Sequence, residues 1–437
     1  MAALRRLCFY VGYLVLACAV VLVCTEIGSM LVAGFYRGAY LRLSVLAPEL
    51  EYEPTFRSPF SLRNRLPDDF RDASHAYDGY PWADAFLREA SDAWFEWPHR
   101  YEPFRVWGNV PRRGTYINVD EGLRGAWRRT TNACAADGAP PLQVWVFGGS
   151  SVLGIDTPDF ATIPSALARE LNGAGGRCIG VLNLGVVGYG INQEAILLGE
   201  LLKAGHRPDA VVFYDGANDA YIGGFSPGVA WAHGDLEAIA QRVERSVYVD
   251  GVAEASYAVQ VAQGVLRRLQ RTPDAPASAR PIALKVRDTL DNYDATLTVI
   301  RTLADSYGFT THFFWQPVLH YGARPRSAFE EMVATYPSFN DPLENETTIA
   351  VYREAERRAA SGRFAFLGHV FDAVSEPVYV DSVHVGPRGN EVVARAIAAA
   401  LAEAGALSPA TATGPGTAAR PRASDGSAAP ARGSGPS

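Results

Sequence analysis

Three side chains that together can cleave an ester occur in the C-terminal two thirds of the chain. Ser150 follows two glycines, and Asp381 and His384 stand three positions apart near the C-terminus. A serine hydroxyl is a weak nucleophile until a histidine removes its proton, and the histidine needs a carboxylate to fix its tautomer and stabilise its cation. Ser150, His384 and Asp381 supply all three groups, which indicates acyl transfer by nucleophilic catalysis.

Acyl transfer also needs hydrogen-bond donors aimed at the negative charge that develops on the substrate oxygen. The backbone N–H groups of Ser150 and Gly188 and the side-chain amide of Asn218 are the candidates. Each lies in a glycine-containing segment directly after a predicted strand. Because ligands of open α/β sheets bind beyond the carboxyl ends of the strands, we expect these donors to converge there.

The elements that must position these groups alternate between short apolar runs and longer helical patterns from Leu142 to Ala406. Strands are predicted at 143–147, 180–184, 210–214 and 311–315, with a weaker one at 364–367. Helices are predicted at 163–171, 193–204, 282–307 and 391–404, the last after Pro387, which suits a helix start. This alternation is typical of βα units around a mainly parallel sheet.

Four short blocks carry a resemblance to a known family. Gly-Gly-Ser at 148–150, Gly188, Gly-x-Asn-Asp at 216–219 and Asp-x-x-His at 381–384 resemble, in order, the signature of the SGNH (GDSL-type) hydrolases. The resemblance covers about 141–405. It implies a flavodoxin-like three-layer α/β/α fold with a five-stranded parallel sheet, and hydrolysis or transfer of acyl esters with no metal and no organic cofactor.

The same resemblance assigns a role to each block. Ser150 would be the nucleophile, His384 the base and Asp381 the residue that orients it, while Gly188 and Asn218 would join the Ser150 N–H as oxyanion donors. The family's usual Gly-Asp-Ser is Gly-Gly-Ser here, which leaves the nucleophile intact. Ser151 stands beside Ser150, but the two preceding glycines favour Ser150.

Other catalytic signatures are missing from the sequence. It contains no Gly-x-Ser-x-Gly elbow, no His-Glu-x-x-His and no Gly-x-x-x-x-Gly-Lys-Ser/Thr. An ordinary α/β-hydrolase, a zincin and a P-loop protein are therefore disfavoured.

The N-terminal segment predicts a membrane anchor. From Leu7 to Thr25 no residue is charged, and a helix of about 19 residues at about 1.5 Å each is roughly 28 Å long, enough to span a bilayer. Arg5 and Arg6 precede it and Glu26 follows, so the positive-inside bias places the rest of the protein on the periplasmic or cell-surface side. A cleaved signal peptide is the alternative.

The remaining chain divides by composition. We expect the anchor at 1–25, an aromatic-rich extension at 26–140, a catalytic domain at 141–407 with an insertion at 222–281, and a disordered tail at 408–437. The tail is built almost entirely from Ala, Gly, Pro, Ser, Thr and Arg, with too little apolar bulk to order it. The rings of the extension are expected to pack against the domain; a carbohydrate-stacking surface is the alternative.

Charge and cysteine content exclude further classes. The 40 Lys and Arg against 47 Asp and Glu give a net charge of −7, so nucleic acid is not expected as a partner. None of the five cysteines forms a CxxC pair, which disfavours a structural metal. Cys134 and Cys178 each precede a predicted strand on the oxidising side, and a disulfide between them is a hypothesis beside two free cysteines.

These observations together predict a membrane-anchored serine esterase that removes O-acyl groups, with O-acetyl preferred, from a cell-envelope glycan or related ester. One alternative is an acyltransferase that uses the same triad, since the difference lies in whether the site excludes water. A catalytically silent envelope scaffold or glycan-binding module is a third reading, which the complete set of site residues disfavours.

Overall fold

The computed structural model describes residues 2–37, 74–95, 99–132, 141–173, 178–225, 281–335 and 342–407. The last four ranges contain a parallel five-stranded sheet in the order β6(Ile179–Asn183), β5(Leu142–Gly148), β7(Ala210–Asp215), β8(Thr310–Trp315) and β9(Ala365–Phe366). Numbered by chain order, this is 2-1-3-4-5, the flavodoxin-like arrangement. The predicted fold class is confirmed, and all five predicted strands are present within two residues of their expected ends.

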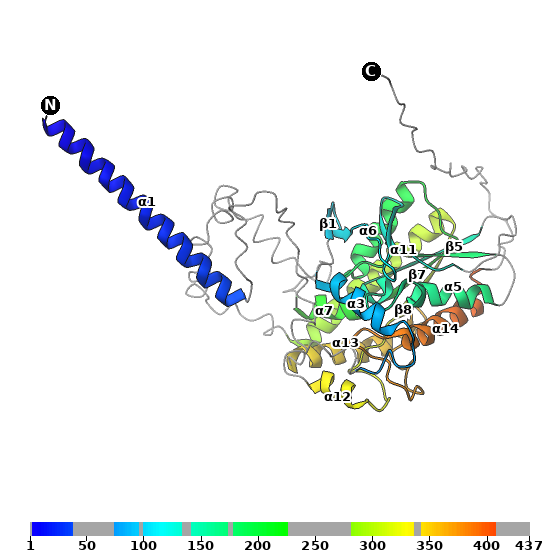
Figure 1. The fold of residues 1–437 in the computed structure, drawn as a ribbon. Helices are drawn as coiled ribbons and strands as arrows, with labels where there is room; N and C mark the ends of the chain where they lie inside the picture. The colour runs from blue at the N-terminus through cyan, green and yellow to red at the C-terminus, as the bar shows by residue number, and fades with distance from the viewer. Residues whose placement is uncertain are drawn as a thin grey trace, which may run out of the picture.

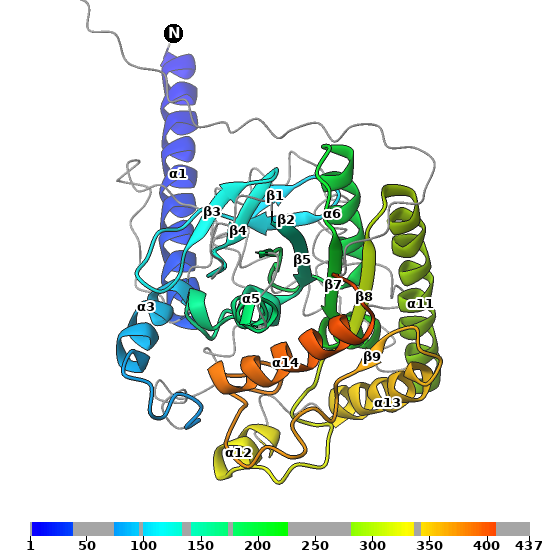
Figure 2. The same ribbon diagram turned by 90° about the vertical axis from the view of Figure 1, so that its right-hand side faces the viewer.

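Helices cover both faces of the sheet (Figures 1 and 2). One face carries α5(Ile163–Gly173) and α14(Pro387–Glu403), and the other carries α6(Ile191–Lys203), α11(Ile282–Tyr307) and α13(Pro342–Ala359). Strand residues alternate between the two cores: Val144 and Val146 face α5 and α14, whereas Trp145 and Phe147 face α6 and α11. This period-2 alternation of apolar residues on both faces explains why the strands read as continuous apolar runs.

The sheet register brings the candidate site together. Val146 of β5 pairs with Asn183 of β6, and Gly148 of β5 pairs with Tyr214 of β7. The carboxyl ends of the three strands are therefore level. The loops that carry Ser150, Gly188 and Asn218 all leave the same edge.

The aromatic-rich extension contains elements that the sequence did not predict. They are α3(Ala83–Phe95) and two antiparallel hairpins, β1(His99–Glu102) with β2(Val106–Asn109), and β3(Val119–Gly122) with β4(Gly125–Arg128). The β3–β4 turn has two central residues, Leu123 and Arg124, both with positive φ. Such turns normally use Asn-Gly or Asp-Gly, so Leu-Arg gives no turn signal in the sequence.

The described part of this extension packs mainly against the α/β domain, as expected. Trp127 joins the core that contains Phe147 and Phe213, and Tyr77, Phe86 and Ile117 form a smaller core with Val380. Two rings of the extension do not pack against the domain in this way: Tyr101 is 78% exposed and Phe104 is 84% exposed.

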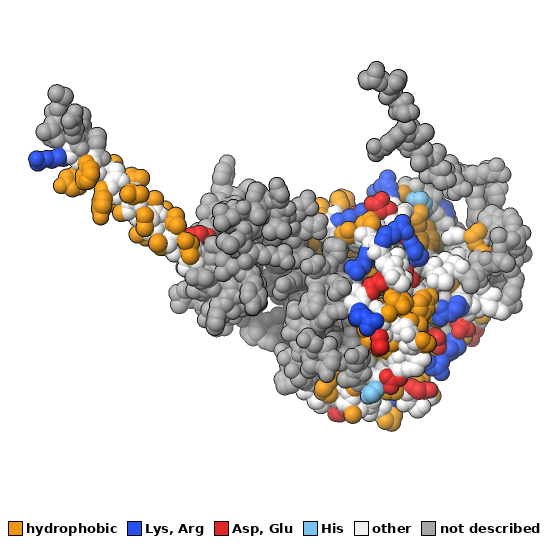
Figure 3. All heavy atoms as spheres, viewed as in Figure 1, with side chains coloured by type: hydrophobic (Ala, Val, Ile, Leu, Met, Phe, Trp, Pro, Cys, Tyr) orange, Lys and Arg blue, Asp and Glu red, His pale blue; other side chains and the backbone are white. Residues whose placement is uncertain are grey.

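Helix α1(Ala2–Arg37) is longer than the predicted anchor. Within it, Phe9–Ser29 is long and apolar enough to cross a membrane, with a mean hydropathy of 2.2 and none of its residues buried. Figure 3 shows the apolar side chains that cover this helix. Length and composition alone do not separate an anchor from a signal sequence.

Three further predictions fall largely on residues outside the described ranges. Helix α7(Ala217–Phe225) enters the predicted insertion at 222–281, whose remainder up to residue 280 is not described, nor is the tail from 408. Cys178 is disulfide-bonded. Its predicted partner, Cys134, lies outside the described residues, so the pairing stays a prediction.

Candidate active site

Ser150 is the first residue of α4(Ser150–Leu153), directly beyond the end of β5. The two glycines before it are required by close packing. A Cβ on Gly148 would lie 2.3 Å from Val152 Cγ2, and a Cβ on Gly149 would lie 2.2 Å from Asn218 Nδ2. The Gly-Gly-Ser block therefore lets Asn218, which follows β7, approach the backbone next to the serine hydroxyl.

The three predicted catalytic side chains meet in a line. Ser150 Oγ lies 2.6 Å from His384 Nε2, and His384 Nδ1 lies 2.6 Å from Asp381 Oδ2. Ser150 can thus donate its proton to Nε2 while Nδ1–H donates to the carboxylate. The hydroxyl that meets His384 is that of Ser150, not that of Ser151, as the two preceding glycines predict.

A tight loop holds Asp381 against His384. Asp381 Oδ1 accepts the backbone N–H groups of Val383 at 2.7 Å and His384 at 2.6 Å, and the Val380 N–H donates to the His384 carbonyl at 3.0 Å. Burial by itself would raise the pKa of Asp381, but the charge of His384 and these N–H donors outweigh it and lower the pKa. Asp381 is therefore ionised at neutral pH, as a residue that orients histidine must be.

A second carboxylate, which the sequence analysis did not identify, faces the same imidazole. Asp156 Oδ2 lies 3.8 Å from His384 Nδ1, and Asp156 is 5% exposed. Tyr77 of the N-terminal extension donates its hydroxyl to the Asp156 carbonyl at 2.8 Å. Asp156 belongs to no recognised sequence motif. Its proximity to His384 becomes visible only in the folded structure, where its loop lies beside the imidazole.

Asp156, Asp381 and His384 also offer three potential metal ligands within 4.8 Å of one another. The His384 Nδ1 to Asp381 Oδ2 separation of 2.6 Å is that of a hydrogen bond. Nδ1 then carries a proton directed at Asp381 and has no lone pair for a metal ion. The geometry supports a triad with an additional negative charge.

Replacing Asp156 by Asn should shift the pH dependence of activity. The Asp156 carboxylate favours the imidazolium form of His384, and the base must be neutral to act. In Asp156→Asn we therefore expect the apparent pKa of the acidic limb of kcat/KM to fall. Asp120→Asn, on the β3–β4 hairpin, is the control and should leave the limb in place. An unshifted limb in Asp156→Asn would show that this carboxylate does not act on His384.

The candidate oxyanion donors lie on neighbouring loops. Gly188 follows β6 with φ +73°, and Asn218 is the second residue of α7. Asn218 Nδ2 donates to the Tyr189 carbonyl at 2.7 Å. An amide nitrogen carries two hydrogens, so this bond fixes the Asn218 side chain and leaves a second donor. The structure brings the Gly188 loop, Asn218 and Ser150 to one place; their role as donors is a proposal.

Three buried carboxyl groups lie behind these donors. Glu194, Asp215 and Asp219 are 0%, 4% and 7% exposed. Burial raises the pKa of Asp219 to about 6, against the lowering effect of N–H donors from Ile191 and Gly216. Burial, and next the Asp215 charge, raise the pKa of Glu194 well above its ordinary value. Glu194 therefore holds its proton to higher pH than an exposed glutamate does.

Replacing Glu194 by Gln tests this protonation through stability. A carboxyl whose pKa is raised in the folded state stabilises the protein most below its unfolded pKa, and that contribution falls as pH rises toward the folded pKa. As the pH rises above about 4.5, the unfolding free energy of the wild type should fall, and we expect Glu194→Gln to reduce that fall by up to about 1.4 kcal/mol per pH unit. Urea unfolding of the full chain in detergent measures it, with Glu391→Gln, on the surface of α14, as control. Parallel curves for wild type and Glu194→Gln would refute it.

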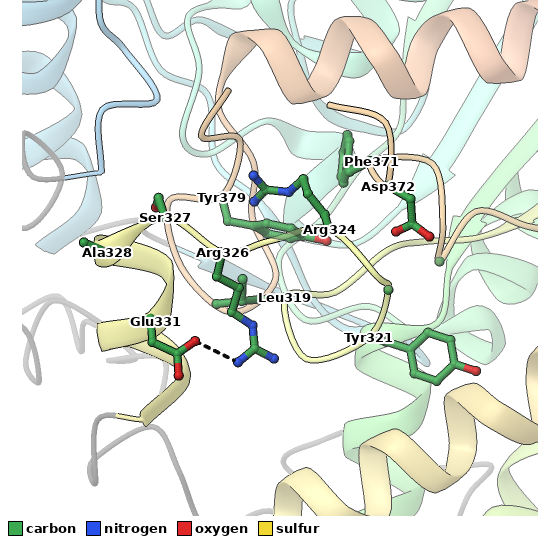
Figure 4. A pocket seen from close by; sticks show the side chains of 12 residues that line it. Leu319, Tyr321, Arg324, Arg326, Ser327, Ala328, Glu331, Phe371, Asp372 and Tyr379 are labelled. Atoms are coloured by element: carbon green, nitrogen blue, oxygen red, sulfur yellow. Dashed lines mark hydrogen bonds and ion pairs between the residues drawn. The ribbon is translucent and has the colours of Figure 1, made fainter. Parts of the chain in front are cut away.

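A pocket of 380 Å³ lies apart from these side chains, between the loop after β8, the start of α12(Ala328–Thr335) and the turn at 368–372 (Figure 4). Ser150, Asp381 and His384 do not line it. Its charged groups already have partners: Arg326 pairs with Glu331 at 3.3 Å, Arg324 with Glu330, and Asp372 with His369 at 2.9 Å. This pairing disfavours an ionic ligand.

Neither a protein-family model nor a curated protein matches the chain. Similar solved structures include a member of the lipolytic G-D-S-L family from Veillonella parvula, at 12% identity and a TM-score of 0.30, covering 58% of this chain and 94% of that one. The acetyl xylan esterase AlAXEase has 12% identity and a TM-score of 0.32, covering 60% and 100%. A catalytic mutant of the acetylxylan esterase Axe2 from Geobacillus stearothermophilus has 15% identity and a TM-score of 0.31, covering 60% and 94%.

Identities and TM-scores this low carry no inference about activity or substrate. The fold is established by the strand order, the parallel register and the helices on both faces. At the level of that fold, an α/β/α sandwich with a five-stranded parallel sheet, the chain agrees with the SGNH hydrolases that its four sequence blocks resemble.

Proposed function

We propose that the protein is a serine esterase that uses Ser150 as nucleophile, His384 as general base and acid, and Asp381 as the residue that orients His384. The observation that carries the proposal is the continuous hydrogen-bonded line from Ser150 Oγ through both nitrogens of His384 to Asp381, each step at 2.6 Å. This line provides a path for one proton away from the hydroxyl, which is what serine needs to attack an ester carbonyl.

The reaction follows from these positions. Ser150 Oγ bonds to the ester carbonyl carbon as its proton passes to His384 Nε2, and the carbonyl oxygen becomes an anion that the N–H groups of Ser150 and Gly188 and the Asn218 amide stabilise. The anion collapses, the C–O bond to the alcohol breaks, and His384 returns the proton to the alcohol. Water, deprotonated by His384, then releases the acid and restores Ser150.

The location and the substrate class form the finer part of the proposal. The apolar segment of α1 supports a membrane anchor, and Arg5 and Arg6 before it support a position of the α/β domain outside the cytoplasm. The exposed ring of Phe104 supports a carbohydrate substrate, since sugars stack on aromatic faces. The proposed reaction is removal of an O-acyl group, with O-acetyl preferred, from a cell-envelope glycan.

The test uses the full chain purified in detergent. We expect wild type to release acetate from p-nitrophenyl acetate and from an O-acetylated polysaccharide, and Ser150→Ala to release none above background. If the acetyl group instead appears on an added unacetylated glycan, the protein is a transferase. A folded wild type as inactive as Ser150→Ala would overturn the proposal.

A further inference from the structure

The β1–β2 hairpin of the N-terminal extension lies against the loop that carries Gly188. Trp107 of β2 donates its indole N–H to the Val187 carbonyl at 2.8 Å, and its ring lies 6.0 Å from that of Tyr189. A Cβ built on Gly188 would lie 3.4 Å from Trp107 Cζ2, the van der Waals contact distance. The indole therefore covers one side of Gly188 and is partly exposed beside it.

A buried polar network fixes this indole in place. The Arg105 side chain, 2% exposed, pairs with Glu200 of α6 at 2.7 Å and with Glu102 at 3.2 Å, and donates to the Tyr189 hydroxyl at 2.9 Å. That hydroxyl in turn donates to the Trp107 carbonyl. Figure 2 shows the hairpin beside α6. Because these groups are buried and paired, they hold the hairpin firmly against this edge of the domain.

A second set of contacts joins the hairpin to the same loop. Gln193 Nε2 donates to the Arg105 carbonyl at 2.8 Å, and Asn109 Nδ2 donates to the Gly185 carbonyl at 3.0 Å. The Tyr189 carbonyl accepts from Asn218. One short loop thus connects the indole of Trp107 with both predicted oxyanion donors beyond Ser150.

The direction of the reaction decides which part of the ester meets the indole. The leaving alcohol must lie toward His384, which protonates it, and the carbonyl oxygen must lie between Gly188 and Asn218. The remaining substituent on the carbonyl carbon is the acyl chain. It extends away from His384, and on the Gly188 side of the site Trp107 is the described side chain that a Cβ built on Gly188 would meet within 4 Å.

We infer that Trp107 forms a wall of the acyl site and restricts the substrate to short acyl groups. This inference rests on the proposed esterase function and adds its acyl specificity. On this inference an acetyl methyl is short enough to stop before the indole, whereas longer chains meet a ring that the Arg105 network holds in place. The residue that sets acyl length then comes from the N-terminal extension rather than from the four sequence blocks.

The test compares kcat/KM for p-nitrophenyl acetate, butyrate and octanoate in the full chain in detergent. Trp107→Ala should raise the butyrate-to-acetate ratio by about tenfold or more, the scale on which pockets discriminate methylene groups. Trp107→Phe, which keeps a smaller ring, should give an intermediate ratio. Tyr101→Ala is the matched control, because Tyr101 pairs directly with Trp107 across the hairpin but is 78% exposed. It should keep the wild-type ratio.

The outcomes separate this inference from the proposed function. Acetate hydrolysis that persists in Trp107→Ala with an unchanged butyrate-to-acetate ratio overturns the inference and leaves the esterase proposal standing. An equal rise of the ratio in Tyr101→Ala also overturns it, since disturbance of the hairpin rather than removal of the indole would then be the cause. If wild type and Ser150→Ala are equally inactive on every ester, the proposed function fails and this inference fails with it.

Discussion

Ser150→Ala is expected to lower kcat/KM for p-nitrophenyl acetate by about 10⁴-fold or more, because removal of a triad nucleophile leaves only the oxyanion donors and substrate binding. The Ser150 hydroxyl oxygen contacts His384 Nε2. Ser150 is the first residue of α4 and directly follows Gly149. An alanine there fits the same backbone and removes only the oxygen. The loss should therefore appear in activity and not in the unfolding transition.

Ser151→Ala is the matched control, because Ser151 is the next residue of the same helix and an alternative nucleophile by sequence. It should keep activity within a few-fold of wild type. Single-turnover measurements on both variants separate acylation from acyl-enzyme hydrolysis. A Ser151→Ala variant that loses activity while Ser150→Ala retains it would reverse the assignment of the nucleophile.

Arg128→Met is expected to lower the free energy of unfolding by about 3–5 kcal/mol, the cost of leaving one member of a buried ion pair without its partner. The Arg128 side chain is fully buried and its Nε lies 2.5 Å from Asp159 Oδ1. It also donates to the carbonyls of Gly154 at 3.3 Å and Thr157 at 2.8 Å. Arg128 therefore joins the N-terminal extension to the loop that places Asp156 beside His384.

Arg129→Met provides the comparison on the adjacent residue. Arg129 pairs with Asp120, but the two side chains are 42% and 34% exposed, and surface pairs contribute about 0–1 kcal/mol. Chemical unfolding of both variants, with esterase activity measured in parallel, gives the difference. Equal stability of Arg128→Met and Arg129→Met would show that the extension contributes little to the stability of the domain.

The strands and helices of the α/β domain could be predicted because each has a local signal. Buried parallel strands are continuous apolar runs, and the helix predicted at 282–307 coincides with α11. The structure shows Pro281 directly before this helix and Gly308, with φ +77°, directly after it. The β1–β2 and β3–β4 hairpins carry no such signal. Their strands have four residues each, and their turns use Phe104, Leu123 and Arg124 at positive φ, where sequence reasoning expects glycine or asparagine.

The residues of the candidate site also fall into two groups, those that the sequence identified and those that only the structure identified. Ser150, His384 and Asp381 could be named because a nucleophile, a base and a carboxylate that orients the base follow from side-chain chemistry and from the motifs that hold them. Asp156 and Trp107 could not, because an isolated Asp or Trp has many uses and its neighbours are distant in sequence. The Trp107 indole N–H bonds a carbonyl 80 residues away, and Arg128 bonds Asp159 across 31 residues.

The amino-acid sequence by itself determined the parallel sheet, the apolar N-terminal helix and the identity of the Ser150, His384 and Asp381 groups, because hydrophobic periodicity and reactive side chains are local properties. Only the tertiary structure decided that the N-terminal extension packs beside the Gly188 loop, that Asp156 lies near His384 as a second carboxylate and that Trp107 covers Gly188. Those contacts depend on buried hydrogen bonds and ion pairs between distant segments, whose partners are selected only when the chain is packed.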